Sequence, residues 1–123
     1  MNSARVLFFG LTSTYLVAVL VQFFLAGLVT FGTSDWDLHR GVGFALGIAS
    51  LVLLFIAILG RRPRRLVLGT LLLVGLNGLQ MVLANIDVEE LAALHPVNAV
   101  AIAALAFALT QRSRTYVTSK MAA

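Results

Sequence analysis

The chain has 123 residues, of which 60% are hydrophobic and 11% are charged, and its formal net charge is +4. This composition excludes an ordinary soluble domain, in which about 25% of residues are charged. The chain has no cysteine, which excludes disulfides, iron–sulfur clusters, thiolate metal sites and C-x-x-C-H haem attachment.

Four stretches are long and apolar enough to cross a bilayer, which requires roughly 20 mainly apolar residues. In chain order they lie near residues 6–30, 38–60, 66–86 and 91–110. The first stretch is too long for the core of a signal peptide and no A-x-A-like cleavage site follows it, so we predict a retained helix. Short connections predict one domain over residues 1–123, an all-α antiparallel four-helix bundle in the membrane.

The charged residues are separated by sign along the chain. Eight of the nine basic residues lie before the first stretch, between the second and third, or after the fourth: Arg5, Arg61, Arg62, Arg64, Arg65, Arg112, Arg114 and Lys120. All five acidic residues lie in the other two loops: Asp35, Asp37, Asp87, Glu89 and Glu90. The positive-inside rule therefore predicts that both termini are cytoplasmic, and the basic charge reflects orientation instead of a nucleic-acid partner.

Local signals place the helix ends. Ser34 and Asp37 have the spacing of a capping box that starts the second helix, and Pro63 lies in the turn that stops it. Pro96 predicts a kink near the start of the fourth helix. The polar tail after Arg112 is predicted to be frayed.

The chain also contains an internal repeat. Residues 21–27 (VQFFLAG) in the first helix align with residues 79–85 (LQMVLAN) in the third. Carried onward, and allowing a two-residue difference in loop length, the alignment matches Leu38-His39 with Leu94-His95. The only two histidines thus match each other, which predicts two parallel helical hairpins related by an axis along the membrane normal.

The two histidines are the strongest candidates for chemistry. On a helix, Gly43 and Gly47 share a face with His39, and Ala99 lies one turn after His95. Small residues below both imidazoles leave space for a flat cofactor between diagonal helices. A lone interfacial histidine is usually only solvated, and small residues also let membrane helices pack closely. The matched pair favours a cofactor over that simpler interpretation.

Haem is the first candidate cofactor, because histidine is a common axial ligand of haem iron. Two neutral imidazoles, His39 and His95, predict a bis-histidine b-type haem, one per chain, suited to electron transfer. Zinc fits less well, because tetrahedral sites usually take three or four protein ligands. Hydrolytic and phosphoryl-transfer motifs are absent from the sequence.

Amide side chains accompany the histidines. Gln22 and Gln80 lie about two turns below the outer surface and need hydrogen-bond partners, either a ligating imidazole or the opposite helix. Asn98, one turn after His95, is placed to orient a histidine.

Arg40 and Trp36 lie next to His39 at the outer edge of the second helix. Arg40 would pair with haem propionates or extend to lipid headgroups. Trp36 either lines the mouth of the haem site or belongs to the interfacial aromatic belt, and we favour the belt.

These residues resemble one four-helix half of heme A synthase, a family with histidine haem ligands on the second and fourth helices of each half. The resemblance rests on residues 22–27 followed by His39-Arg40, and on residues 80–84 followed by Leu94-His95. The chain is also similar to short four-helix bacterial membrane proteins of that type. The resemblance implies that His39 and His95 ligate one haem, and it implies a bacterial cytoplasmic membrane.

The sequence thus favours a small membrane cytochrome b that exchanges electrons with a quinone or a redox protein. A half-size haem-modifying oxidase and a cofactor-free accessory or scaffold subunit are the alternatives. The bilayer is the surrounding partner, no nucleic acid is expected, and homo-oligomerisation is left open.

Overall fold

A computed structural model describes residues 2–119 of the chain. It contains the long helices α1 (Asn2–Thr30), α2 (Asp37–Leu59), α3 (Arg64–Leu83) and α5 (Leu94–Thr118), and a single turn of helix, α4 (Glu89–Ala92), before α5. All four long helices are long and apolar enough to cross a membrane. The predicted all-α fold with four spans is confirmed.

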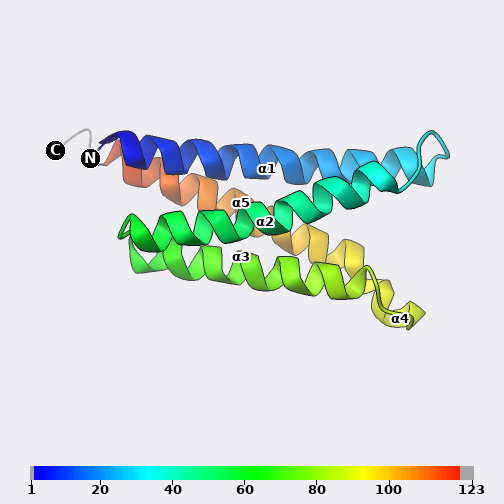
Figure 1. Ribbon diagram of the computed structural model, residues 1–123. Coiled ribbons are helices and arrows are strands. Elements are labelled where there is room, and N and C mark those ends of the chain that lie inside the picture. Colours follow the sequence, from blue (N-terminus) through cyan, green and yellow to red (C-terminus); the bar gives the residue numbers. More distant parts are fainter. Residues whose placement is uncertain (1, 120–123) are drawn as a thin grey trace.

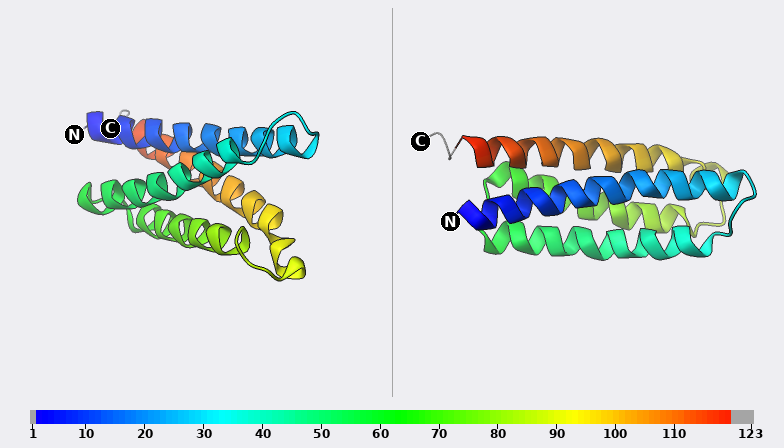
Figure 2. Two further views of the ribbon diagram at one scale, coloured as in Figure 1. Left: turned by 45° about the vertical axis from the view of Figure 1, so that its right-hand side comes forward. Right: turned by 90° about the horizontal axis from the view of Figure 1, so that it is seen from above.

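The four long helices form a ring in cross-section (Figures 1 and 2). α1 packs against α2 and α5, and α3 packs against the same two helices, so α2 and α5 are diagonal partners. The start of α1, the α2–α3 turn and the end of α5 lie at one end of the bundle, and the α1–α2 loop and α4 lie at the other. We call the first the arginine end, after Arg5, Arg61, Arg62, Arg64, Arg65, Arg112 and Arg114, and the second the histidine end.

Large apolar side chains cover the outside of the bundle. Each long helix exposes at least one of them over more than half of its surface: Phe24 (64%), Phe55 (61%), Leu72 (55%) and Phe107 (54%). Such an apolar surface is unsuited to water and suited to lipid, where helices satisfy their own backbone groups. The chain is a multi-pass membrane protein.

Small hydroxylated side chains fill part of the core toward the arginine end. Ser50, Thr70 and Ser113 are at most 1% exposed, and each donates a hydrogen bond to a carbonyl three or four residues earlier in its own helix. The hydroxyl oxygens of Thr12 and Ser113 meet between α1 and α5 at 3.0 Å. These contacts let the helices approach closely without leaving polar groups unpaired.

Two predicted helix ends are wrong. The Ser34/Asp37 capping box does not form, because the Asp35 carboxylate accepts the Asp37 backbone N–H at 3.0 Å instead. The tail is not frayed between Arg112 and Thr118, where α5 continues, and the rest of the predicted tail from Lys120 onward lies outside the described residues. There the Tyr116 ring packs beneath the Arg5 guanidinium of α1 at 4.8 Å, a tertiary contact that holds the last turns.

Both prolines mark helix boundaries. Pro63 precedes the first residue of α3, where its fixed φ and missing N–H suit a helix start. Pro96 lies in the first turn of α5 and has no N–H to donate to the Ala92 carbonyl. The predicted kink takes the form of a break at Ala93, which separates α4 from α5.

Candidate functional site

The two histidines meet at the histidine end of the bundle. His39 lies in the first turn of α2 and His95 in the first turn of α5. Their ring centroids are 6.4 Å apart and their planes are inclined by 57°. Both side chains are half-buried. The ring of helices thus brings together two residues that are far apart in the sequence.

A cavity of about 620 Å³ surrounds this pair. Its volume lies within the roughly 300–1,000 Å³ typical of small-molecule and cofactor sites. All four long helices contribute to its wall, which is mainly apolar with a few polar groups. Of the predicted site residues, the wall contains Gln22, His39, Arg40, Gly43, Gln80, His95 and Ala99.

His95 is held by a chain of side-chain hydrogen bonds. Gln80 Nε2 on α3 lies 3.1 Å from His95 Nε2. The Gln80 Oε1 atom accepts a hydrogen bond from Asn98 Nδ2 at 2.6 Å, and the same Asn98 nitrogen donates to the Leu76 carbonyl oxygen at 2.9 Å. Asn98 is 7% exposed. It therefore acts on His95 through Gln80, below the cavity wall.

His39 has different surroundings. Gln22 Nε2 on α1 donates to its backbone carbonyl at 3.0 Å, not to its ring. The Trp36 ring lies edge-on at 5.3 Å between centroids. A Cβ atom on Gly43 would lie 2.8 Å from Gln22 Nε2, so this glycine makes room for the amide. The two glutamines of the predicted repeat thus bond a backbone carbonyl in one case and an imidazole in the other.

Unpartnered polar atoms gather around the cavity. Within the described part of the chain, four buried side-chain atoms have no hydrogen-bond partner: Gln22 Oε1, His39 Nδ1, His95 Nδ1 and Arg62 Nε. Three of the four belong to residues of the cavity wall. Since buried polar groups are rarely left unpaired, this concentration makes the cavity the candidate functional site.

The remaining predicted residues have peripheral places. Arg40 lies in the cavity wall with its side chain 74% exposed, 3.8 Å from the Asp37 carboxylate. Such an exposed ion pair is weak, so the guanidinium is free to pair with another anion. Gly47 is not in the cavity wall, and a Cβ atom there would meet nothing within 4 Å.

Some residues in the wall of the histidine cavity were not predicted as site residues, or were predicted to have another role. Trp36, favoured as part of the aromatic belt, lies in the wall. Asn77 lies there too and donates to the Tyr15 hydroxyl across the bundle at 2.8 Å. Spacing offered a signal for Asn77, one turn before Gln80 on α3, and for Ala84, one turn after Gln80 and directly after the end of α3.

The donor set disfavours a metal ion bound by side chains alone. Among residues 2–119, no three His, Cys, Asp or Glu side chains are grouped closely enough to hold a metal ion. A tetrahedral zinc site needs three or four such ligands. The two imidazoles of the cavity are fewer than such a site needs.

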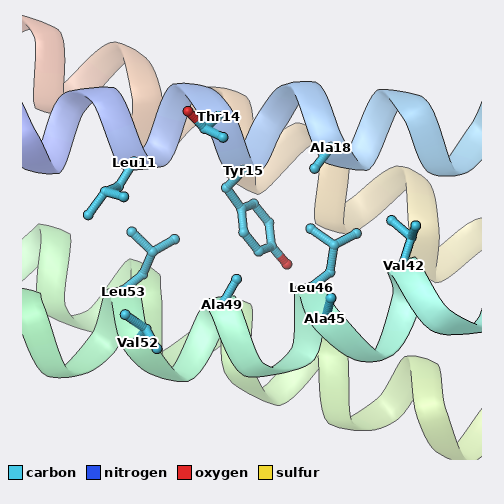
Figure 3. A pocket seen from close by; sticks show the side chains of 10 residues that line it. All are labelled: Leu11, Thr14, Tyr15, Ala18, Val42, Ala45, Leu46, Ala49, Val52 and Leu53. Carbon is cyan, nitrogen blue, oxygen red and sulfur yellow. The ribbon is translucent and has the colours of Figure 1, made fainter.

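A second hollow lies between α1 and α2 and is almost wholly apolar (Figure 3). It measures about 350 Å³, and Leu11, Tyr15 and Ala18 from α1 face Leu46, Ala49 and Leu53 from α2 across it. It contains no histidine, acid or base. It shares Leu46 with the histidine cavity but none of that cavity's polar residues.

The fold and the cavity define a four-helix membrane protein with a paired-histidine site. Comparison with known families matches residues 22–87, more than half of the chain, to DUF6220, described as a family of unknown function. The chain belongs to this family. The matched segment includes Gln22, His39 and Gln80 and ends before His95. No curated protein and no solved structure matches the chain.

Proposed function

We propose that this protein is a small membrane cytochrome b that binds one haem b through His39 and His95 and transfers electrons. One observation carries the proposal: the centroids of the two imidazoles lie 6.4 Å apart, with their planes inclined by 57°, in the wall of a cavity of about 620 Å³. Two imidazoles that bind one metal ion from opposite sides, each at about 2.0–2.1 Å, have centroids roughly 6 Å apart. The observed spacing fits that arrangement.

Other residues of the cavity fit a haem as well. Gly43 and Ala99 carry little or no side chain near the ligands, which leaves width for a macrocycle. Arg40 stands at the exposed edge, where it would pair with propionates. Bound between two histidines, the iron would supply one-electron chemistry, with its potential set by the surrounding hydrogen bonds and burial.

The repeat supports the same function. Each half of the chain supplies one glutamine helix and one histidine helix, and His39 and His95 occupy equivalent places in the two halves. This is the arrangement expected of two parallel hairpins around an axis along the membrane normal. It is also what the resemblance to one half of heme A synthase implies for the haem ligands.

We also propose that both termini and the arginine end are cytoplasmic, in a bacterial cytoplasmic membrane. All seven arginines of the arginine end are separated by the length of the bundle from the five acidic residues, which lie at the histidine end. The positive-inside rule then places the haem site near the outer leaflet. A reporter enzyme that is active only on the extracytoplasmic side can be fused to either terminus. Activity of such a fusion would overturn this orientation.

The decisive experiment is the absorption spectrum of detergent-purified protein from haem-sufficient cells. We expect sharp α and β bands on reduction, which disappear in His39→Gly and in His95→Gly. Added imidazole should restore the bands in both variants, because it replaces the missing ligand without changing the fold. A protein that stays colourless after haem titration would overturn the proposal.

A haem-modifying oxidase is the second candidate, suggested by the family resemblance. Such an enzyme changes the haem chemically, whereas a cytochrome returns it unchanged. A modified haem extracted from the purified protein would favour the oxidase. A colourless protein that co-purifies with another membrane complex would favour the cofactor-free accessory subunit.

The electron partner follows from the position of the site. A haem near one leaflet cannot alone carry electrons across about 30 Å of hydrocarbon. A quinone in the membrane or a redox protein at the outer surface would meet the haem at the histidine end. Quinol-dependent reduction of the purified protein in proteoliposomes would distinguish the two partners.

A further inference from the structure

We infer that Gln80 holds the Nε2 lone pair of His95, so that His95 binds a metal only after this hydrogen bond is broken, whereas His39 binds directly. The inference rests on the proposed function and assigns the two ligands unequal roles. Gln80 is a positioning residue in this scheme, because it acts through His95.

The first step is the orientation of the two amides. The Leu76 carbonyl can only accept, so the Asn98 atom 2.9 Å from it must be the NH₂ nitrogen. That nitrogen also lies 2.6 Å from Gln80, so the Gln80 atom facing it must be the carbonyl oxygen. One backbone carbonyl thus fixes which end of each amide faces which neighbour.

The second step is the protonation of His95. With its oxygen turned to Asn98, Gln80 presents its NH₂ group to His95 Nε2 at 3.1 Å. An amide nitrogen can only donate, so Nε2 accepts and carries no hydrogen. In the neutral ring the hydrogen then lies on Nδ1, which is buried and has no partner. Neither nitrogen of His95 has a free lone pair.

His39 lacks any such restraint. No side chain bonds either nitrogen of its ring within the described chain, and Gln22, its counterpart of Gln80 in the repeat, bonds the His39 backbone instead. Nδ1 of His39 is buried without a partner. The ring can therefore adopt either tautomer and offer a lone pair at once.

Unequal ligands follow from this difference. Metal binding by His95 Nε2 must displace the Gln80 amide, which opposes ligation by the strength of one hydrogen bond, a factor of roughly 2 to 10 in affinity. His95 is thus the ligand that leaves first. If haem is held by both histidines, an external ligand would replace His95 before His39.

The matched variants are Gln80→Met and Gln22→Met, which remove the same amide from equivalent places in the two halves. The chain has only two histidines, so their ring nitrogens can be resolved by ¹⁵N NMR of the haem-free protein. We expect wild-type His95 to carry its hydrogen on Nδ1 and Gln80→Met to release a mixture of tautomers. Gln22→Met should leave His95 unchanged.

A second variant keeps the experiment decisive if Gln80→Met does not fold, as judged by circular dichroism. In Gln80→Glu the amide that donates to His95 Nε2 is replaced by a carboxylate, which can only accept a hydrogen bond. The ring hydrogen of His95 should therefore move from Nδ1 to Nε2. Wild-type His95 with its hydrogen on Nε2, or with tautomers unchanged in both Gln80 variants, would overturn the inference.

The loaded protein provides the last measurement. Haem titration should show roughly 2- to 10-fold tighter binding in Gln80→Met than in the wild type, and carbon monoxide should bind to a smaller fraction of the reduced variant. Equal affinity and equal carbon monoxide binding in Gln80→Met and the wild type would overturn the unequal roles. If neither the wild type nor any variant binds haem, the proposed function is overturned. The tautomer measurement would then still show whether Gln80 donates a hydrogen bond to His95 Nε2.

Discussion

The imidazole rings of His39 and His95 lie 6.4 Å apart between centroids, although α2 and α5 are diagonal in the bundle. Diagonal helices are the most widely separated pair in a four-helix ring, so both side chains must reach inward to come this close. Neither histidine has a carboxylate partner, and Nδ1 of each is buried without a hydrogen bond. The two rings therefore leave buried nitrogens unpaired at the centre of the histidine end.

Trp36 provides a built-in reporter of that site. It is the only tryptophan of the chain, its ring lies 5.3 Å from His39, and it lines the cavity. Haem bound there would lie close enough to quench its fluorescence almost completely by energy transfer. We expect stoichiometric quenching when the haem-free protein is titrated with haem.

The double variant His39→Ala/His95→Ala is the control for this titration. It keeps Trp36 and the apolar cavity, so any quenching that remains measures unspecific haem partitioning. Equal quenching curves for wild type and double variant would contradict a site at the histidines.

Much of the fold was predictable because membrane insertion is governed by local composition. The second and third helices begin and end within three residues of the predicted stretches, since length and hydropathy suffice there. The extension of α5 to Thr118 was not predictable in this way. It depends on Arg5 of α1 packing over Tyr116, a contact between opposite ends of the sequence.

The candidate site was predictable only in part, for a similar reason. The predicted repeat pointed to His39 and His95 as equivalent residues, and the helical ring brings them together. It also implied equivalent roles for Gln22 and Gln80, yet these residues bond different groups. Hydrogen-bond partners depend on side-chain rotamers and on groups such as the Leu76 carbonyl, which no spacing rule identifies.

Gly43→Ala and Gly47→Ala form a matched pair on α2. A Cβ atom at Gly43 would crowd Gln22 Nε2 at 2.8 Å and displace it from the His39 carbonyl, whereas Gly47 faces open space. Both changes gain up to about 1 kcal/mol in helix propensity. Only Gly43→Ala loses a hydrogen bond, worth about 0.5–1.5 kcal/mol.

Unfolding in mixed micelles should therefore show Gly47→Ala as the more stable variant, by about 0.5–1.5 kcal/mol. Haem affinity should fall in Gly43→Ala and stay unchanged in Gly47→Ala. The same stability for both variants would mean that the Gln22 bond contributes nothing.

Tyr15 and Asn77 join α1 to α3 through a buried hydrogen bond of 2.8 Å. Figure 3 shows the Tyr15 ring directed between α1 and α2, with its hydroxyl toward Leu46. Hydrogen bonds between membrane helices average about 0.6 kcal/mol and reach about 1.7 kcal/mol. We expect Tyr15→Phe to lower the free energy of unfolding by an amount in this range.

Tyr116→Phe is the control, because it changes the only other tyrosine and keeps the ring beneath Arg5. Its free energy of unfolding should match the wild type. A double-mutant cycle with Asn77→Ala should give a coupling energy of about 0.6 kcal/mol; a coupling of zero would show that the hydroxyl and the amide act independently.

Arg61 and Arg62 are neighbours in the α2–α3 turn, but only the Arg62 side chain is buried against another helix. Its side chain is 8% exposed, donates to the Ala4 carbonyl of α1 and lies over the Phe8 ring at 5.4 Å, whereas Arg61 is exposed. Arg62→Ala loses the hydrogen bond, the cation–π contact and the packing of the side-chain stem, which together contribute about 1–3 kcal/mol. Arg61→Ala should change stability by no more than about 0.5 kcal/mol. Both variants lose one positive charge from the same loop, so any effect on membrane orientation would be the same in both. The difference between their free energies of unfolding therefore measures the contacts of Arg62 with α1. Equal destabilisation of the two variants would contradict the placement of Arg62 against α1.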